Sequence, residues 1–387
     1  MQRPLEGIRV LDLGISTAGP YSARFLGDLG ADVIKIEPVD GENARKLGLR
    51  YGGIGYLYHV NNYNKRSIVL KVQAPRGRDI FLDLVRESDI VVENFATGTM
   101  DRWGIGFEQC RAANPSIIYC SAKGFGDSGI LKDRRAFDTV IQALCGIMYL
   151  TGHPDQGPVK AGPSVCDLMT AALSALAMVS ALATRRTGES QFLDCAMFDM
   201  GVWSLLEYWP LALRERSETL ERCGNHHPLH APFGTYAAAD GLVFITLTND
   251  AQWPPLAQLL GLDPTWRLEQ RREHRNEIDL ALTIFAKTRP AHEVAATLQS
   301  HGVPAGPVWD LAQVVASGLL QQRGMVRDSE HPIYGSIPLI QSPVFRNGET
   351  SVWRHQPTLG EHTNGIVGDL LSKSDDLAEL TAEGILA

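Results

Sequence analysis

Short apolar runs alternate with amphipathic stretches along the first third of the chain. Such runs are typical of buried strands. Proline at position 20 and glycine at position 30 are the start and stop signals of a helix between the first two expected strands. Strands that alternate with helices indicate βαβ units. We therefore expect an α/β fold with a doubly wound, mostly parallel, Rossmann-like sheet. The expected strands are residues 8–13, 32–37, 67–70, 89–93 and 116–120, with a helix through 81–85.

Longer apolar segments follow and predict helices at 137–150, 165–183 and 197–213. The second is rich in alanine but interrupted by Asp, Thr and Ser, so we interpret it as a core helix and not as a membrane span. After residue 225 the pattern predicts a hairpin over 233–248 that turns at Asp240-Gly241. Helices are expected at 250–260 and 276–301.

These changes of pattern predict a large domain and a small one. Residues 1–215 form the N-terminal part of the large domain, and residues 225–310 form a small α+β domain. Residues 311–387 are expected to return to the large domain, through a polar linker at 313–332 and ending in a short helix at 375–385.

Composition narrows the classes of function. The 387 residues carry 36 Lys+Arg against 44 Asp+Glu, a formal charge of −8, which argues against nucleic acid or a membrane surface as the partner. The 6 cysteines include no CxxC pair, and this suits reduced thiols better than disulfides or a zinc site. No apolar targeting segment is visible near Met1, so we expect a cytoplasmic protein.

Asp167 is the candidate for the chemistry. It lies at the start of the 165–183 helix, directly after a Gly-Pro loop. A helix N-terminus stabilises an ionised carboxylate through the macrodipole and the free backbone N–H groups, so Asp167 could be a nucleophile at neutral pH. Two alternatives stay open: Asp167 serves only as an N-cap, or the neighbouring Cys166 is a thiol nucleophile.

Other residues suggest an anionic ligand. The 14–20 loop opens a helix but is not GxGxxG, so NAD binding is disfavoured even though Glu37 lies where a ribose carboxylate would. His226, His227 and His230 match no standard zinc spacing, and we expect no metal. Cationic side chains gather near strand ends, where loops of a parallel sheet converge, and would suit a ligand with several phosphates. These are Lys65, Arg66, Lys71, Arg102, Lys123, Arg134 and Arg135.

Motifs in a fixed order then point to a family. They are residues 10–13 with 18–20, 29–37, 64–68, 92–95 with 101–102, 137–138 with Gln142, Asp167, 227–228 with 231–232, 249–250 with 252–253, 302–307 and 359–363. Together they resemble the class III coenzyme A transferases of the CaiB/BaiF type, over almost the whole chain. The family implies an interlocked homodimer. Whether the partner chain is identical or a paralogue stays open.

The resemblance implies that CoA moves from an acyl-CoA donor to a free carboxylic acid through a thioester on Asp167. CoA is then a substrate, with no tightly bound cofactor, and backbone N–H groups near Thr17 and Ala18 would stabilise the oxyanion. By position, the residues assigned to CoA are Thr17, Ala18, Leu70, Lys71, Gln73, Asn94, Phe95, Arg102, Lys123, Arg135, Phe137 and Asp138.

Departures from the family pattern bear on specificity. Formyl-CoA transferase has glutamine where this chain has Thr17, arginine where it has Pro38, and a glycine-rich loop that residues 225–232 lack. We therefore expect small to medium dicarboxylates or hydroxy acids as acceptors, with His226, His227 and His230 as contacts. One alternative is an acyl-CoA racemase, which requires a histidine at position 137, where this chain has phenylalanine. Another is a non-catalytic CoA-binding subunit.

Overall fold

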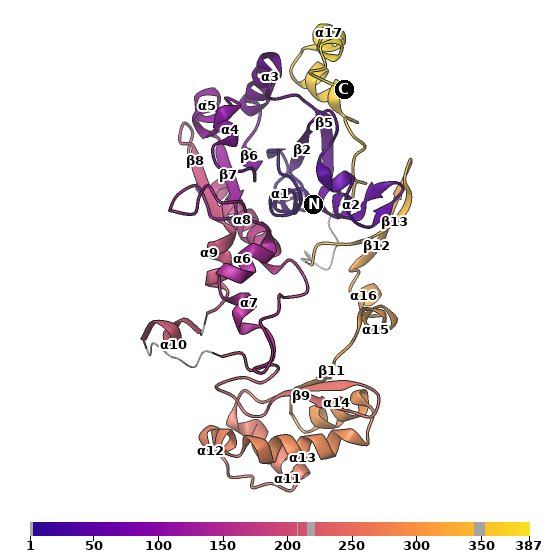
Figure 1. Ribbon diagram of the computed structural model, residues 1–387. Helices are drawn as coiled ribbons and strands as arrows, with labels where there is room; N and C mark the ends of the chain where they lie inside the picture. Colours follow the sequence, from indigo (N-terminus) through magenta and orange to yellow (C-terminus); the bar gives the residue numbers. More distant parts are fainter. Residues whose placement is uncertain (1–2, 207, 215–220, 344–352) are drawn as a thin grey trace. The chain divides into compact units, whose positions relative to one another are not determined.

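The computed structural model describes residues 3–206, 208–214, 221–343 and 353–387 (Figure 1). The chain divides into two compact units. The first comprises Met1–Ile147, Ala161–Leu206 and Gln321–Ala387, and the second Met148–Lys160 and Glu207–Leu320. The sequence analysis placed 148–160 in the large domain. Arg222 explains the difference, because its guanidinium donates to the backbone oxygens of Tyr149, His153 and Gln156, at 3.0 to 3.4 Å, and so ties this segment to the second unit.

A six-stranded parallel sheet forms the centre of the first unit, in the order β5-β2-β1-β6-β7-β8. This is a doubly wound order: β2 and β5 lie on one side of β1, and β6, β7 and β8 lie on the other, so the switch point falls between β1 and β6. The βαβ pattern predicted such a sheet. The strands are β1 (Arg9–Asp12), β2 (Asp32–Glu37), β5 (Lys65–Val69), β6 (Ile90–Glu93), β7 (Ile118–Lys123) and β8 (Gln191–Ala196).

Helices connect these strands, and α8 (Val165–Thr184) links β7 to β8. It packs against α1, β7 and β8. Among the described residues α8 is the helix long and apolar enough to cross a membrane by length and composition, and these contacts make it the core helix that was expected. The other helices that frame the sheet are α1 (Ala18–Asp28), α3 (Pro75–Arg86), α4 (Thr99–Arg102), α5 (Phe107–Ala113), α6 (Asp138–Leu144) and α9 (Met197–Trp203), whereas α7 (Ile147–Leu150) belongs almost wholly to the second unit.

Three predicted helices are broken in the structure. Gly146, with φ at +98°, separates α6 from α7, because this left-handed conformation ends a helix and suits glycine. The predicted helix 197–213 becomes α9 and α10 (Tyr208–Arg214), and residue 207 lies outside the described residues. The predicted helix 276–301 becomes α13 (Arg275–Lys287) and α14 (Ala291–Ser300), separated by Pro290, which lacks the N–H that a continuous helix needs.

The second unit has its own antiparallel sheet, β11-β10-β9, and the predicted hairpin turns at Asp240-Gly241. Its core includes Trp253, which is fully buried and donates its indole N–H to the backbone oxygen of Asp263 at 2.9 Å. The further elements of this unit are β9 (Phe233–Ala237), β10 (Leu242–Thr246), β11 (Ala305–Pro307), η2 (Asp250–Gln252), α11 (Trp253–Leu260), α12 (Leu268–Glu273) and α15 (Leu311–Ala316).

The C-terminal segment corrects one prediction. Residues 326–340 form the hairpin β12 (Val326–His331) and β13 (Gly335–Ile340), where a polar linker was expected over 313–332. Four of the six side chains of β12 are not buried, so its polar pattern hides the strand. The remaining elements are η1 (Asn43–Arg45), β3 (Arg50–Tyr51), β4 (Ile54–Gly55), α2 (Tyr56–Asn62), α16 (Leu319–Gln322), η3 (Asn364–Leu370), η4 (Ser374–Asp376) and α17 (Leu377–Ala382).

Candidate active site

Two carboxylates meet at the start of α8. Asp138 is the first residue of α6, and its Oδ1 accepts the backbone N–H groups of Cys166 at 2.8 Å and of Asp167 at 3.1 Å. Asp138 therefore caps α8 from another segment of the chain. The residue at the N-cap position, Ser164, makes no capping hydrogen bond with its side chain, and Asp167 is the third residue of the helix. The alternative that Asp167 is only an N-cap is wrong.

Gln142 holds Asp138 in place. Its side-chain N–H donates to Asp138 Oδ2 at 2.6 Å, and its Oε1 accepts the backbone N–H of Ala161 at 2.9 Å. The Asp138–Gln142 pair thus fixes both the loop before α8 and the first turn of that helix. Asp138 was assigned to CoA from sequence, but its carboxylate is buried and both oxygens are used inside the protein. Asp138 is therefore not a CoA contact; it holds the first turn of α8, which carries Asp167.

Burial and then the charge of Asp138 raise the pKa of Asp167 from its ordinary value of 3.8 to about 7. The sequence analysis expected the helix N-terminus to stabilise the ionised form. That expectation is wrong, because Asp138 already takes the backbone N–H groups of the first turn and places a like charge nearby. Within the described part of the chain, no hydrogen bond to the Asp167 carboxylate is found, so this carboxylate is left available for chemistry.

Cys166 lies beside Asp167 but is fully buried. A hydrogen bond with the Cys145 thiol, together with burial, raises the pKa of the Cys166 thiol. A Cβ built on Gly201 would lie 2.7 Å from the sulfur of Cys145 and 3.5 Å from that of Cys166, so this glycine closes the space around both thiols. A buried thiol with a raised pKa does not serve as the nucleophile, and the Cys166 alternative is disfavoured.

The loop that follows β1 forms a second part of the site. Asn94, directly after β6, exchanges two hydrogen bonds with Ile15: its Oδ1 accepts the backbone N–H at 2.7 Å, and its Nδ2 donates to the backbone oxygen at 2.8 Å. The contact joins the loops that follow β1 and β6, the two neighbouring strands at the switch point of the sheet. Ligands of open α/β sheets bind at this point.

Two more side chains hold the next residue of that loop. Ser16 has φ at +61°, and its backbone N–H donates to Glu42 Oε2 at 3.2 Å while its oxygen accepts from Asn61 at 2.6 Å. Thr17 and Ala18 come next and open α1. Their backbone N–H groups have no acceptor among the described residues, so they are free to bind an oxyanion or a phosphate.

A cavity of about 160 Å³ lies at the carboxyl ends of β1, β2, β5 and β6. It contains three of the residues assigned to CoA, namely Leu70, Gln73 and Phe95. Trp103 packs edge to face on Phe95, with ring centroids 5.0 Å apart, and gives the cavity a second aromatic wall. Apolar and aromatic walls suit the adenine or pantetheine part of CoA.

Three members of the predicted cationic cluster, Lys65, Arg66 and Lys123, are paired with carboxylates in the structure. Lys65 is buried, donating to Asp12 at 2.7 Å, and Arg66 pairs with Asp32 at 2.8 Å; both lie at the amino end of β5, away from the expected crevice. Lys123 forms ion pairs with Asp127 and Glu93, which neutralise its charge. Lys71, Arg102, Arg134, Arg135 and the ring of Phe137 are exposed and remain predicted CoA contacts or phosphate ligands.

The loops that carry these exposed residues meet. The Thr97 hydroxyl donates to the backbone oxygen of Lys132 at 2.8 Å, which joins the segment after β6 to the segment after β7. The CoA assignments around Asn94 and Arg135 therefore lie on neighbouring loops. Glu37, in contrast, is bound bidentately by Arg45 at 2.7 Å and is fully enclosed, so it cannot contact a ribose as an NAD site would require.

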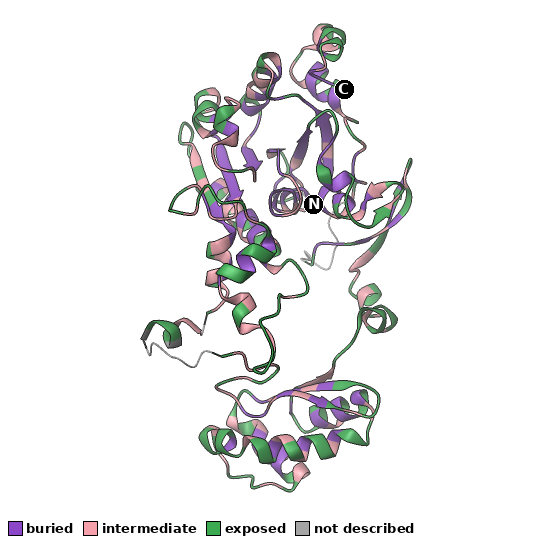
Figure 2. Cartoon of the chain, viewed as in Figure 1, coloured by how far each residue is buried: buried purple, intermediate pink, exposed green. Residues whose placement is uncertain are grey.

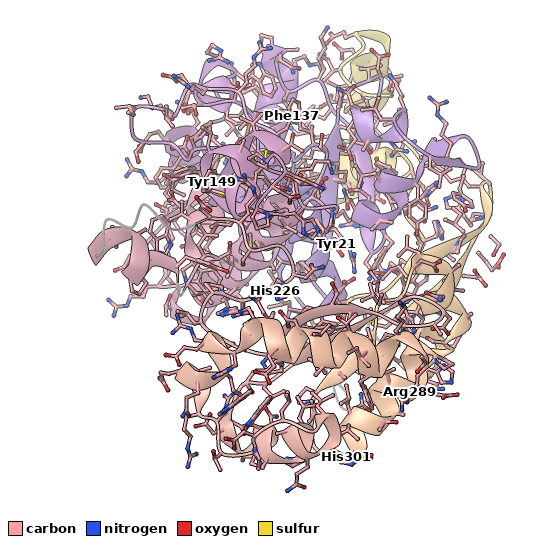
Figure 3. The ribbon with its side chains drawn as sticks, turned by 60° about the horizontal axis from the view of Figure 1, so that its bottom comes forward. Tyr21, Phe137, Tyr149, His226, Arg289 and His301 are labelled. Atoms are coloured by element: carbon pink, nitrogen blue, oxygen red, sulfur yellow. The ribbon has the colours of Figure 1, made fainter. Side chains whose placement is uncertain are left out.

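The histidines lie in the second unit, where Arg275 donates to the backbone oxygens of His227 at 2.9 Å and His230 at 2.7 Å. Figure 3 labels His226 of this group. The rings of His227 and His230 are 4.7 Å apart. The assignment of His226, His227 and His230 to the acceptor acid stays a prediction.

A group of three side chains with metal-ligand atoms, which the sequence did not indicate, is brought together by the fold from β12 and the C-terminal segment. It consists of His331, His355 and Glu361. Both ring nitrogens of His331 are already hydrogen-bonded to backbone groups, of Gln356 at 3.1 Å and of Ile333 at 3.0 Å. The three residues form no local sequence motif, because His331 is separated from the other two by more than a strand of the hairpin.

Comparison with known proteins places this site in a family. The model of CoA-transferase family III matches residues 5–363. A succinyl-CoA–D-citramalate CoA-transferase of Chloroflexus aurantiacus is 34% identical, over 99% of this chain and 98% of that protein. A succinate–glutarate CoA-transferase of Agrobacterium fabrum is 32% identical, over 95% and 96%. The crystal structure of a CAIB/BAIF family protein from Brucella suis is 35% identical with a TM-score of 0.83, over 96% of this chain and 100% of that one.

The chain therefore belongs to CoA-transferase family III. It is an enzyme that transfers CoA from an acyl-CoA to a free carboxylic acid. The resemblance drawn from the sequence motifs is confirmed, and the alternatives of a racemase and of a silent subunit are set aside.

Proposed function

We propose that Asp167 is the nucleophile of this transfer. Its carboxylate attacks the donor thioester and gives a mixed anhydride and CoA thiolate; the thiolate then attacks the aspartyl carbonyl, which releases the donor acid and leaves an aspartyl-CoA thioester. The acceptor carboxylate attacks that thioester, and the returning thiolate takes up the acceptor's acyl group and frees Asp167. The observation that carries the proposal is the half-buried Asp167 carboxylate, which the fold leaves without a hydrogen-bond donor among the described residues.

We propose that the adenine or pantetheine part of CoA occupies the cavity lined by Leu70, Gln73 and Phe95, whose volume of about 160 Å³ admits only part of the coenzyme. The exposed cations Lys71, Arg102 and Arg135 suit its phosphates. The free N–H groups of Thr17 and Ala18 would stabilise the oxyanion that develops on the thioester carbonyl. The support for this part is the rigid hold on residues 15 and 16, because a loop fixed before binding needs no reorganisation during the reaction.

We propose dicarboxylic acids as acceptors and a short dicarboxyl-CoA as donor. The support is chemical: both relatives carry succinate or succinyl-CoA in their names, and D-citramalate and glutarate are dicarboxylates. The sequence-based prediction that His226, His227 and His230 contact the acceptor acid is kept as part of this proposal.

We further propose a homodimer. Large apolar side chains lie exposed on the helices around Asp167, and Figure 2 shows much of α6 as exposed. Leu176 on α8 and Trp203 on α9 are 60% and 59% exposed. The three helices α6, α8 and α9 pack against one another, and exposed large apolar side chains gathered on neighbouring helices favour a protein interface. The exposed apolar residues of these helices are Val140, Leu144, Leu168, Leu176 and Trp203.

A trapping experiment tests the nucleophile. The enzyme is incubated with succinyl-CoA and hydroxylamine, and peptides are analysed by mass spectrometry for an aspartyl hydroxamate. We expect the hydroxamate at Asp167, and we expect Asp167→Ala to lose both the label and turnover while it retains CoA binding. Asp79→Ala, at an exposed position of α3, is the matched control. Turnover that survives Asp167→Ala, or a hydroxamate on another residue, would reject the mechanism.

A further inference from the structure

Asp138 contacts the helix that carries the proposed nucleophile, and its carboxylate is buried. One of its oxygens accepts two N–H groups of the first turn of α8, and the other is held by Gln142. The three donors use the carboxylate fully in its ionised form. A negative charge is therefore fixed next to Asp167, in a buried setting and in one orientation.

On the proposed role of Asp167 as nucleophile, we propose that Asp138 is a positioning residue that favours the covalent intermediate, by repelling the free Asp167 carboxylate but not the acylated one. Two ionised carboxylates side by side disfavour each other. The aspartyl-CoA thioester is neutral at that atom, so its formation relieves the repulsion. The same cap keeps the first turn of α8 ordered in both states.

The other ionisable groups near this end of α8 do not replace Asp138. Coulombic influence on Asp167 comes from Asp138, and the thiols of Cys145 and Cys166 are hydrogen-bonded to each other. The charged groups on the neighbouring elements are either paired or exposed. These are Arg24 with Asp28 on α1, Lys123 with Asp127 and Glu93 at β7, Asp194 on β8 and Asp199 on α9.

The substitution Asp138→Asn removes the charge and keeps one oxygen acceptor, while its Nδ2 cannot accept the hydrogen bond that Gln142 donates to Asp138 Oδ2. Asparagine keeps an oxygen that can accept the two backbone N–H groups and is as good a helix cap as aspartate. Two quantities are measured on the full-length enzyme: the pH dependence of succinyl-CoA consumption, and the fraction of protein carrying CoA at equilibrium with succinyl-CoA, by intact-protein mass spectrometry. Asp133→Asn, five residues earlier and exposed, is the matched control.

We expect the acid limb of the pH profile, centred near pH 7 in the wild type because the pKa of Asp167 is about 7, to move down by about one pH unit or more in Asp138→Asn. The CoA-loaded fraction at pH 8 should fall, by about tenfold in the loading equilibrium constant for each pH unit moved. A purely structural role predicts an unchanged acid limb and an unchanged loading constant in Asp138→Asn, and that result would overturn the proposal.

A second variant covers the case in which Asp138→Asn does not fold. Asp138→Ser also keeps an oxygen acceptor without a charge, and the same two measurements apply. Failure of the mechanism itself is distinguishable, because then the wild-type enzyme carries no CoA on Asp167 at any pH. If the wild type is loaded and both variants load equally well with an unmoved acid limb, Asp167 remains the nucleophile and Asp138 is only a cap.

Discussion

Asn94 and Ile15 exchange two hydrogen bonds, of 2.7 and 2.8 Å, where the order of the strands switches from one side of β1 to the other. The pair joins the loop before α1 to the loop after β6, and both loops carry residues assigned to CoA. One side chain thus ties together two walls of the proposed coenzyme site.

Asn94→Ala should weaken acyl-CoA binding, because two hydrogen bonds of about 1 kcal/mol each are lost from the loop that presents Thr17 and Ala18. We expect the KM for succinyl-CoA to rise about tenfold or more, measured by steady-state kinetics, with a smaller change in Tm. Asn276→Ala, at an exposed position of α13 in the other unit, should leave KM unchanged. An unaltered KM in Asn94→Ala would mean that this loop does not contribute to coenzyme binding.

Asp167→Asn should stabilise the folded enzyme at alkaline pH. The pKa of Asp167 in the folded protein, about 7, lies above its ordinary value of 3.8, so ionised Asp167 disfavours folding; the penalty is absent below about pH 4 and complete above about pH 7. At about 1.4 kcal/mol per pH unit, the substitution gains at most about 4 kcal/mol at pH 8. Urea unfolding at pH 4 and pH 8 measures this difference in unfolding free energy between the variant and the wild type.

The gain in Asp167→Asn should shrink towards pH 4, whereas Asp79→Asn should show no such pH dependence. A variant less stable than the wild type by the same amount at both pH values would contradict the raised pKa of Asp167. The expected gain in Asp167→Asn would show that the position of Asp167 costs folding stability, as active sites often do.

Removing Arg45 should destabilise the first unit strongly. Its guanidinium binds Glu37 bidentately at 2.7 Å and stacks 3.8 Å over the Tyr58 ring, and both acidic and basic side chains are buried. Loss of one partner leaves an uncompensated buried charge, which costs about 3–5 kcal/mol. We expect Arg45→Ala to lose that much unfolding free energy in urea.

The double variant Arg45→Met with Glu37→Leu should recover most of the loss, since it buries no charge. Arg50→Ala, which is exposed, is the control for the removal of an arginine. A double variant as unstable as Arg45→Ala would show that packing, and not the ion pair, holds this region together.

Gly77→Ala should disturb the segment that carries Lys71 and Gln73. A Cβ at position 77 would lie 2.1 Å from the backbone oxygen of Lys71, so the chain must shift by more than a side-chain rotation allows. We expect a loss of about 1–3 kcal/mol in unfolding free energy and a raised KM for acyl-CoA. Gly157→Ala, which has no atom within 4 Å of its Cβ, should change neither.

Much of the sheet could be predicted because its central strands are continuous apolar runs. β2 has the bounds that the sequence indicated, Asp32–Glu37, and it is buried on both faces. β8, at the edge of the sheet, was missed, because Gln191–Ala196 follows a polar turn and its first four side chains are exposed or only half-buried. Helix breaks at Gly146 and Pro290 depend on backbone conformation, which apolar periodicity does not reveal.

The site was predictable only in part, for a similar reason. Asp167 stands out locally, as a carboxylate at the start of an apolar helix. Its partner Asp138 is 29 residues away in sequence, and the hydrogen bonds that reassign it arise only when α6 docks on α8. Lys65 and Lys123 show the converse, since Asp12 and Glu93, both distant in sequence, pair with cations that seemed free for a phosphate.

Asp167 lies in the crossover helix between β7 and β8, so one segment of the chain carries both the proposed nucleophile and the connection to the edge strand of the sheet. An insertion or deletion within α8 is therefore expected to affect the edge of the sheet and the proposed reactive centre together.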